Sequence, residues 1–333
     1  MRAIPLFLIL ALALTGCESS PDTPPEAGEP GQPGAGGAGN AKKPPKPTNL
    51  LAENERSQLY FDLDQYTGRY MTARDQGNAR AYTSLHASVL MPMVERNIDE
   101  LTRTVRDPEQ MRYRIIAARA LGFGSDLSGD RIVPALVSVL EDKNVNLANS
   151  ALVSLYLLGW AETPIAPIVT LLNHPDLLLR SNGALAISAV LRAKRKEAED
   201  RIEMTMEIRE ASGRLMALAM NPDEDAFVRA HSASALGNIG DPASADVLLN
   251  LLLDQYQVVR IHSAQGLGNL GQESAILPLI NALKVTESRN EARIIVASLE
   301  EIATALDYPV DKEALGTEEE NWRAWYAAIK AGK

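Results

Sequence analysis

A pattern that recurs every 31 residues constrains the fold of this chain more than any other feature. The segment VRAHSASALGNIG from Val228 returns as VRIHSAQGLGNLG from Val259. Self-similarity of this length is typical of arrays in which each unit is one supersecondary hairpin. Because one such hairpin cannot bury its own apolar face, its neighbours must stack on it. The sequence therefore predicts a stack of similar units.

More divergent copies extend the array towards both ends of the chain. We align the copies on an anchor position, which is Arg260 in the second segment. Each copy has an apolar residue seven positions after its anchor, and most copies have another ten positions after it. We expect each unit to form a first helix, a turn that contains glycine, and a second apolar helix. The anchors are Arg114, Ala148, Arg180, Arg229, Arg260 and a position near Ala292, and the expected second helices are 132–140, 164–172, 247–253 and 275–283.

The Leu-Gly-Asn and Gly positions of these units resemble HEAT repeats, in particular the short bacterial type also found in phycobilin lyase subunits. The resemblance covers about 107–303, whereas the residue patterns of tetratricopeptide and ankyrin repeats are missing. It implies an all-α protein, a right-handed α-solenoid of HEAT-like helical hairpins. Aromatic residues make up only 5% of the chain, which suits closely packed helices. The second helices are expected to line a concave surface.

Several recurring residues have a structural interpretation. Glycines at the expected turns can end the first helix in a left-handed conformation, which other residues resist. Carboxylates six positions before an anchor can pair with arginines or cap helices along the stack. The glycines are Gly124, Gly159, Gly240 and Gly271, and the carboxylates are Asp142, Asp223 and Asp254.

The amino-terminal end predicts export and lipid attachment. Arg2 precedes an apolar run over 4–14, which is shorter than the about 20 residues that a membrane-spanning helix needs. The residues that follow, Leu14-Thr15-Gly16-Cys17, resemble a bacterial lipobox. This resemblance implies that 1–16 is a signal peptide and that Cys17 carries lipid. Glu18 stands where the inner-membrane retention signal has Asp, so outer-membrane residence facing the periplasm is favoured.

The rest of the chain divides into four expected parts. Residues 17–48 are rich in proline and glycine and predict a tether that spans roughly 30 Å. Residues 49–107 predict an N-terminal helical hairpin with helices at about 50–72 and 78–105. The HEAT-like repeats follow over 108–305, with a charged helical insert at about 192–214, and 306–333 form a C-terminal capping helix.

Residues suited to chemistry are sparse. His231 and His262 occupy equivalent positions in successive units, but no third or fourth ligand lies at metal spacing. The net charge of −10 argues against a nucleic-acid partner, which would be bound through clustered Lys and Arg. No nucleophile elbow, HExxH motif or phosphate-binding Walker loop is present. We therefore expect no cofactor, no metal, no small-molecule substrate and no enzymatic activity.

The favoured function is a membrane-anchored scaffold that binds another protein of the bacterial cell envelope. The residues considered for partner binding are Asn250, Asn281, Trp322 and Trp325. The charged insert is either a solvated pair of long helices or a projection that docks a partner, and the tryptophans either seal the last repeat or form an interaction hot spot. Two other functions remain open, an enzyme or enzyme-accessory role of the phycobilin-lyase type and a purely architectural spacer.

Overall fold

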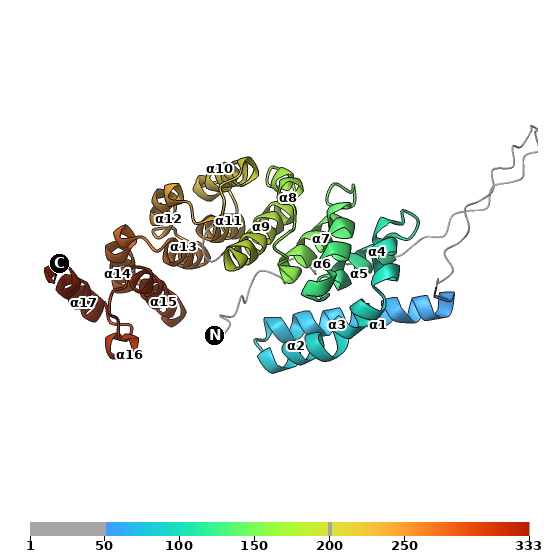
Figure 1. Ribbon diagram of the computed structural model, residues 1–333, viewed down its shortest axis with the longest axis horizontal. Coiled ribbons are helices and arrows are strands. Elements are labelled where there is room, and N and C mark those ends of the chain that lie inside the picture. Colours follow the sequence, from blue (N-terminus) through green and yellow to red (C-terminus); the bar gives the residue numbers. More distant parts are fainter. Residues whose placement is uncertain (1–50, 199–201, 333) are drawn as a thin grey trace, which may run out of the picture.

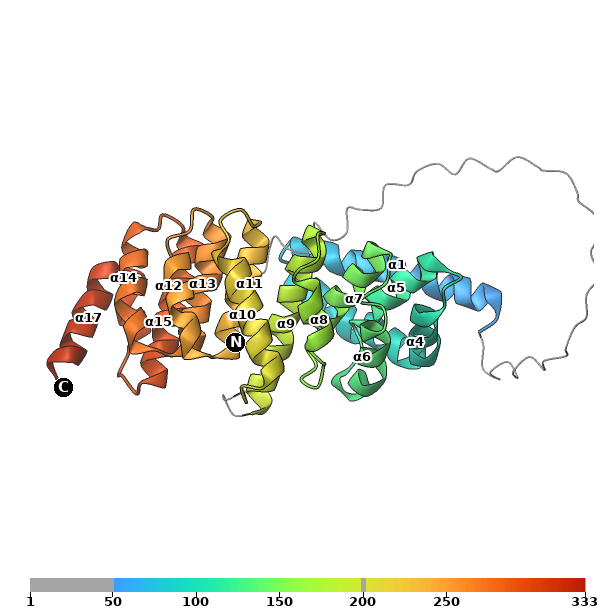
Figure 2. The same ribbon diagram turned by 90° about the horizontal axis from the view of Figure 1, so that it is seen from above.

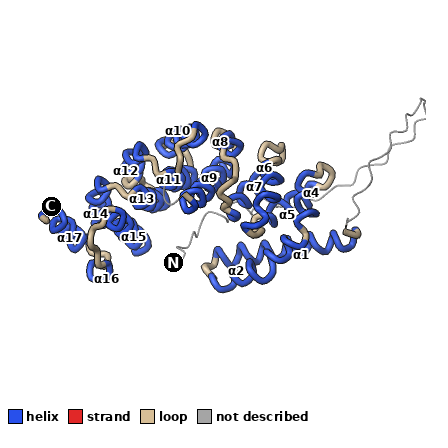
Figure 3. Tube along the Cα trace, viewed as in Figure 1, coloured by secondary structure: helices blue, strands red, loops and turns tan. Residues whose placement is uncertain are grey.

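The computed structural model describes residues 51–198 and 202–332, and this part of the chain is built from helices without any strand (Figures 1 and 3). Helical hairpins stack side by side into an elongated solenoid, which confirms the all-α repeat fold expected from the sequence. Cys17, the signal peptide and the tether lie outside the described residues. Within them, no helix combines the length and the apolar character that crossing a membrane requires.

A long hairpin opens the described part of the chain. Its first arm is α1 (Glu53–Asp75), and its second arm is a nearly continuous run of α2 (Ala79–Leu85), a π-helical turn (His86–Leu90), α3 (Met91–Arg96) and α4 (Ile98–Arg106). Gly77, with a φ of 69°, forms the turn between the arms. The hairpin lies against α5 (Met111–Leu121), where Tyr60 stacks on Tyr113 with ring centroids 4.4 Å apart.

Two layers of helices form the repeats, and every anchor position recognised in the sequence lies in the first layer. The first helices are α5, α7 (Val145–Leu158), α9 (Leu177–Glu197), α11 (Ala226–Ile239), α13 (Gln257–Leu270) and α15 (Arg289–Ala305). The second helices are α6 (Gly129–Val137), α8 (Ala166–Leu171), α10 (Met206–Met220), α12 (Ala245–Leu251) and α14 (Ile276–Val285). Figure 2 shows the same stack from above.

Close approach of the first helices determines which way the solenoid curves. A Cβ atom added to Gly237 of α11 would lie 2.3 Å from the Cα of Gly266 on α13, so the two backbones touch. The first helices α9, α11, α13 and α15 pack directly on one another, whereas contacts between successive second helices are fewer. The stack therefore bends towards its first helices, which form the inner side of the arch in Figure 1, while α8, α10, α12 and α14 form the outer side.

Left-handed glycines end three of the first helices. Gly159, Gly240 and Gly271 close α7, α11 and α13 with φ values of 53°, 73° and 64°. Gly124 does not adopt the left-handed conformation that the sequence predicted for it. Helix α5 instead ends at Leu121 and is followed by Gly122 in a right-handed conformation, so the turn has already begun before residue 124.

Ion pairs connect most of the repeats to the next one along the chain. The arginine of one first helix reaches a carboxylate that stands before or within the following first helix. These pairs are Arg114–Asp142 at 2.8 Å, Arg180–Glu224 at 2.7 Å, Arg229–Asp254 at 3.0 Å and Arg260–Glu291 at 2.7 Å. Of the three carboxylates expected to pair, Asp142 and Asp254 do so, each with the arginine of the preceding repeat. Arg180 pairs with Glu224 and not with the expected Asp223, because the loop between α10 and α11 brings the Glu224 carboxylate to Arg180.

The last repeat is covered by a C-terminal helix. Helix α16 (Lys312–Leu315) leads into α17 (Glu319–Ala331), which packs on α14. The Trp322 side chain is fully buried in this contact, and its Nε1 donates to the carbonyl oxygen of Gly316 at 3.0 Å. Helix α17 therefore covers apolar surface that α14 would otherwise expose to water.

Candidate binding groove

A groove runs along the inner side of the arch. The first helices α7, α9, α11, α13 and α15 line it, and the tip of the N-terminal hairpin, with Tyr70, Arg74 and Tyr82, borders one end. Its volume is about 1610 Å³, which exceeds the ~300–1,000 Å³ of pockets that enclose small molecules. The groove therefore has the size to hold an extended ligand that contacts several repeats.

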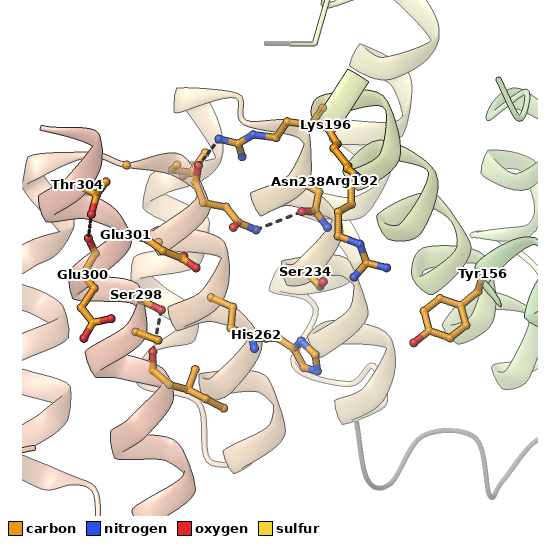
Figure 4. A pocket seen from close by; sticks show the side chains of 18 of the residues that line it. Tyr156, Arg192, Lys196, Ser234, Asn238, His262, Ser298, Glu300, Glu301 and Thr304 are labelled. Carbon is orange, nitrogen blue, oxygen red and sulfur yellow. Dashed lines mark hydrogen bonds between the residues drawn. The ribbon is translucent and has the colours of Figure 1, made fainter. Parts of the chain in front are cut away.

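Uncharged polar side chains form the middle of the groove (Figure 4). The amide of Asn269 donates to the side-chain oxygen of Asn238 at 3.2 Å, which links α13 to α11. Asn238 in turn donates to the hydroxyl of Ser188 on α9 at 2.9 Å. These bonds connect α9, α11 and α13, and they orient the half-buried Asn269 amide, which can donate to and accept from a polypeptide backbone.

His262 lies in this middle part, beneath the polar side chains. Its side chain is only 7% exposed, and its Nδ1 atom has no hydrogen-bond partner among the described residues. The ring packs edge-to-face on the fully buried His231, with centroids 6.1 Å apart. Burial lowers the pKa of His262 to about 4 and that of His231 to about 3, so both rings are neutral near pH 7.

The two histidines do not belong to a metal site in the part of the chain that the structure describes. No group of three or more His, Cys, Asp or Glu side chains there could hold an ion. His231 instead makes hydrogen-bond contacts at 3.0 Å between its Nδ1 atom and both the hydroxyl and the carbonyl oxygen of Ser181. The pair is thus part of the packing between α9, α11 and α13.

Basic side chains from α9 stand at one end of the groove. Arg192 and Lys196, one helical turn apart, are exposed and form no ion pair with any described residue. Arg195 lies between them and donates to the carbonyl oxygens of Asn269 at 2.7 Å and Gly237 at 3.3 Å. Those carbonyls lie near the C-termini of α13 and α11, where a cation is favoured by the helix dipole. Arg195 thus fixes the end of α9 over the groove.

Aromatic side chains adjoin this basic end. Arg74 of α1 donates to the hydroxyl of Tyr156 on α7 at 2.8 Å and lies 5.5 Å from the centre of that ring. Tyr70 packs edge-to-face on Tyr82 at 5.8 Å and on Phe123 at 4.7 Å. The N-terminal hairpin is thereby attached to the repeats, and its tip becomes part of the groove wall.

Carboxylates from α15 stand at the opposite end of the groove. Glu300 and Glu301 line it together with Thr304, as Figure 4 shows. The Glu301 carboxylate lies over Gly268 of α13, so close that a Cβ added there would be 2.5 Å from its Oε2. Burial raises the pKa of Glu301, while the attraction of Arg195 opposes that rise. Glu301 accepts no hydrogen bond from the described residues, which leaves its carboxylate available to a ligand.

The expectation that the second helices line the inner surface is wrong. Asn250 on α12 is exposed but does not line the groove, and its side-chain amide donates to Asp246 of its own helix. Asn281 on α14 accepts from Arg323 of α17 at 2.8 Å. Both lie in the second layer, because the close glycine contacts of the first layer place that layer on the inner side.

The two tryptophans considered for partner binding are engaged within the chain. Trp322 cannot reach a partner because it is fully buried. Trp325 is half-buried, donates from Nε1 to the carbonyl oxygen of Pro309 at 2.7 Å, and packs against Trp322 with centroids 5.4 Å apart. The C-terminal aromatics therefore pack over the last repeat instead of forming an exposed cluster.

The residues at the two ends of the groove were not among those predicted from the sequence to bind a partner. Arg192 and Lys196 fall in the charged insert, which in the structure includes the end of α9 and the first part of α10. Their spacing of four residues was a usable signal for one helix face. Glu301 and Tyr156 carried no such signal, because nothing in their local sequence distinguishes them from other exposed helix residues.

Two comparisons concern the repeats directly. Residues 195–268 match HEAT repeats, and residues 259–284 match the PBS lyase HEAT-like repeat. The chain contains HEAT-like repeats. These matches include α11 and α13 and most of the segment that forms the middle of the groove.

The similarity to whole proteins is lower. No curated protein matches the sequence. Among solved structures, a designed armadillo repeat protein is 17% identical with a TM-score of 0.47, over 61% of this chain and 98% of its own. Human deoxyhypusine hydroxylase, in complex with glycerol, is 19% identical with a TM-score of 0.28, over 82% of this chain and 96% of its own.

Proposed function

We propose that this chain is a lipid-anchored scaffold whose HEAT-like repeats bind an extended segment of another cell-envelope protein in the inner groove. The observation that carries the proposal is the groove itself, which runs across five first helices and offers amide, hydroxyl and charged groups along its length. Repeat solenoids create extended concave surfaces of this kind, on which successive units contact successive parts of a ligand.

The side chains of the groove favour a polypeptide as the ligand. Ser234, Gln265 and Asn269 offer both donors and acceptors, which an extended backbone with its alternating N–H and C=O groups can use. Tyr82 and Tyr156 at one end offer apolar ring area together with hydroxyl groups, a combination enriched at protein interfaces. The volume of the groove leaves most of it unfilled by a small molecule.

The place of action in this proposal comes from the sequence of the amino-terminal segment. The lipobox resemblance at Leu14 to Cys17 assigns the lipid to Cys17, and Glu18 favours the outer membrane. Several acyl chains on one residue hold a protein durably, because each buried methylene contributes about 0.8 kcal/mol. The proline-rich tether would then let the groove search the periplasm within roughly 30 Å of the membrane.

Site-specific photocrosslinking in living cells tests the binding surface. A benzophenone amino acid placed at Ser234 or Gln265, both half-buried in the groove, is expected to give a discrete crosslinked product. The same probe at Asp246, which is exposed on the outer helix α12, is the matched control and is expected to give none. Equal products from both surfaces, or none from the groove, would argue against the proposed scaffold.

Replacement of the lipid-bearing residue tests the anchor separately. Cys17→Ala is expected to move the protein from the membrane fraction to the soluble fraction and to block incorporation of labelled palmitate. The groove crosslinks should persist in this variant if the partner reaches the same compartment, because recognition resides in the repeats. Unchanged membrane association of Cys17→Ala would contradict lipid anchoring at this residue.

A further inference from the structure

We infer that the groove selects a segment whose charges are segregated, with acidic residues at the α9 end and basic residues at the α15 end. This inference rests on the proposed function and adds to it the charge pattern of the bound segment. The two ends of the groove carry opposite charges, and the residues that α11 and α13 contribute to the groove between them are uncharged near pH 7. Charge complementarity of this kind fixes the register and direction of a bound chain more than its raw affinity.

The α9 end is suited to carboxylates. Arg192 and Lys196 are both exposed and lack an ion pair with the described residues, so a ligand would not have to displace an internal acid. Arg74, behind them, is held by the Tyr156 hydroxyl and adds a further positive charge to the same wall. Three cationic side chains thus face the groove within reach of the hairpin tip.

The α15 end is suited to cations. Glu301 accepts no hydrogen bond from the described residues, and burial raises the pKa of its carboxyl. The Glu301 side chain is nevertheless exposed, so an incoming Lys or Arg can pair with its carboxylate in addition to the attraction of Arg195. The neighbouring Glu300 adds a second negative charge to this wall, and the exposed Thr304 adds a hydroxyl.

The side chains that α11 and α13 contribute to the groove add no charge between its two ends, while Arg195 of α9 reaches across the C-termini of both helices to the Asn269 carbonyl oxygen. Every residue that α11 and α13 contribute to the groove is uncharged near pH 7, including His262, whose pKa is lowered to about 4. The Nδ1 atom of that ring is buried and has no hydrogen-bond partner among the described residues. The middle of the groove therefore favours a neutral, polar stretch of backbone.

The number of helices sets the length of that stretch. Three helix-to-helix steps separate α9 from α15, and packed helices lie about 8–10 Å apart, which gives a separation of roughly 25–30 Å. An extended chain advances about 3.3 Å per residue, so about eight residues connect the two ends. The ligand is thus expected to carry an acidic and a basic cluster about eight residues apart.

Two synthetic peptides of the same composition test this pattern on the purified full chain. One carries a block of glutamates, about six neutral residues and a block of lysines, and the other contains the same residues with the charges alternating. Fluorescence anisotropy at low salt is expected to show binding of the segregated peptide at least about tenfold tighter than binding of the alternating one. The preference is expected to shrink as salt is added.

Charge-reversal variants then assign each end of the peptide. The double variant Arg192→Glu/Lys196→Glu makes both ends of the groove acidic. This variant should therefore bind a peptide with lysine blocks at both ends more tightly than the segregated peptide. Glu301→Lys reverses a charge at the α15 end and should move the preference towards a peptide with glutamate blocks at both ends. The matched control, Arg209→Glu/Arg214→Glu, makes the same charge change on the outer helix α10 and should leave the segregated peptide preferred.

The outcomes separate this inference from the proposed function. Equal binding of the segregated and alternating peptides, binding of neither, or identical behaviour of the groove variants and the α10 control would overturn the charge pattern. Groove crosslinks from Ser234 in cells would still support the scaffold in that event. Loss of those crosslinks together with the peptide preference would overturn both.

Discussion

Arg260 shows how single residues hold neighbouring repeats together. Its Nε and Nη2 atoms donate to the two carboxylate oxygens of Glu291 at 2.7 and 2.8 Å, and its Nη1 donates to the carbonyl oxygens of Asp254 and Gln255. Glu291 is only 3% exposed, so its charge depends on this one arginine. The pairing raises the pKa of Arg260 through the hydrogen bonds to Glu291.

Removal of that arginine should be costly. Arg260→Met leaves a buried carboxylate without a cation and is expected to lower the free energy of unfolding by about 3–5 kcal/mol in chemical denaturation. The double variant Arg260→Met/Glu291→Leu should recover much of the loss, because no buried charge remains. Equal losses in the single and double variants would show that the ion pair is not the source of the effect.

The buried histidines give the protein a pH-dependent stability. Burial lowers the pKa of His262 to about 4 and of His231 to about 3, whereas both should return to about 6.5 in the unfolded chain. Below pH 6.5 the unfolded chain therefore binds more protons than the folded one. As the pH is lowered from 6.5 to 4, the free energy of unfolding should fall by about 1.4 kcal/mol per histidine for each pH unit. Above pH 6.5 the two histidines should cause no such loss.

Denaturation midpoints measured between pH 6.5 and 5 check this slope. Burial alone would raise the pKa of Glu224, but its hydrogen bond to Arg180 lowers it; that group contributes little of the slope in this range, because an unfolded glutamate takes up most of its proton nearer pH 4. The variant His231→Gln/His262→Gln is expected to flatten the pH dependence there, whatever its stability at pH 7. A slope unchanged by the double substitution would assign the effect to other groups.

At the residue scale, the sequence identified the recurring arginines but only some of their partners. Asp142 and Asp254 were visible because each precedes an anchor by six residues. The sequence could not show that each pairs with the arginine of the preceding repeat, because this depends on how the loop turns. Trp322 was visible as one of several aromatics on a helix face, but its complete burial depends on where α17 docks.

At the scale of elements, glycine contacts set the spacing of the first helices. A Cβ on Gly237 would meet the Gly266 backbone at 2.3 Å, and one on Gly122 would meet the Ser154 Cα at 2.7 Å. Backbone atoms cannot move away as a flexible side chain can, so helices on either side of such a contact must separate to admit a methyl group.

Two glycine substitutions of opposite effect test that spacing. Gly237→Ala is expected to lower the stability by about 1–3 kcal/mol, since α11 and α13 would have to move apart. Gly213→Ala, in α10, meets nothing within 4 Å and should stabilise the chain by about 0.5–1 kcal/mol through its helix propensity. Thermal melts of both variants give the comparison, and a loss in both would mean that the packing at Gly237 is not special.

The sequence predicted helices close to the observed ones, but it did not predict which layer faces the groove. Periodicity reports that a helix has an apolar face, and both layers of a stack have one. The curvature depends on contacts between positions that are not equivalent in the repeats, such as Gly237 with Gly266. An alignment of the repeats pairs Gly237 with Gly268 instead, so it does not reveal the contact between Gly237 and Gly266. For this reason the sequence placed Asn250 and Asn281 on the inner surface, whereas they lie in the outer layer.

At the scale of the whole molecule, stability should vary along the stack. Each unit contacts mainly its neighbours, so damage at one end should spread only as far as the coupling between repeats allows. Trp322→Ala removes the largest fully buried side chain at the C-terminal end, a change that typically costs about 3–5 kcal/mol.

Hydrogen exchange followed by mass spectrometry resolves that gradient. In Trp322→Ala, amides of α14 and α17 are expected to lose protection, while those of α5 and α7 exchange as in the unaltered chain. A uniform loss of protection along the whole chain would indicate that the solenoid unfolds as one cooperative unit.

The ion pairs between repeats also bear on how such a chain can change its length over evolution. Arg229 and its partner Asp254 both lie within one 31-residue period, so excision of residues 229–259 would remove a cation and its anion together. The pairs on either side, Arg180–Glu224 and Arg260–Glu291, would remain complete. A gene that gains or loses one period therefore keeps its internal charges matched while the two ends of the groove move apart or together by one helix width. Duplication within the gene would thus be a direct route to recognising a longer segment.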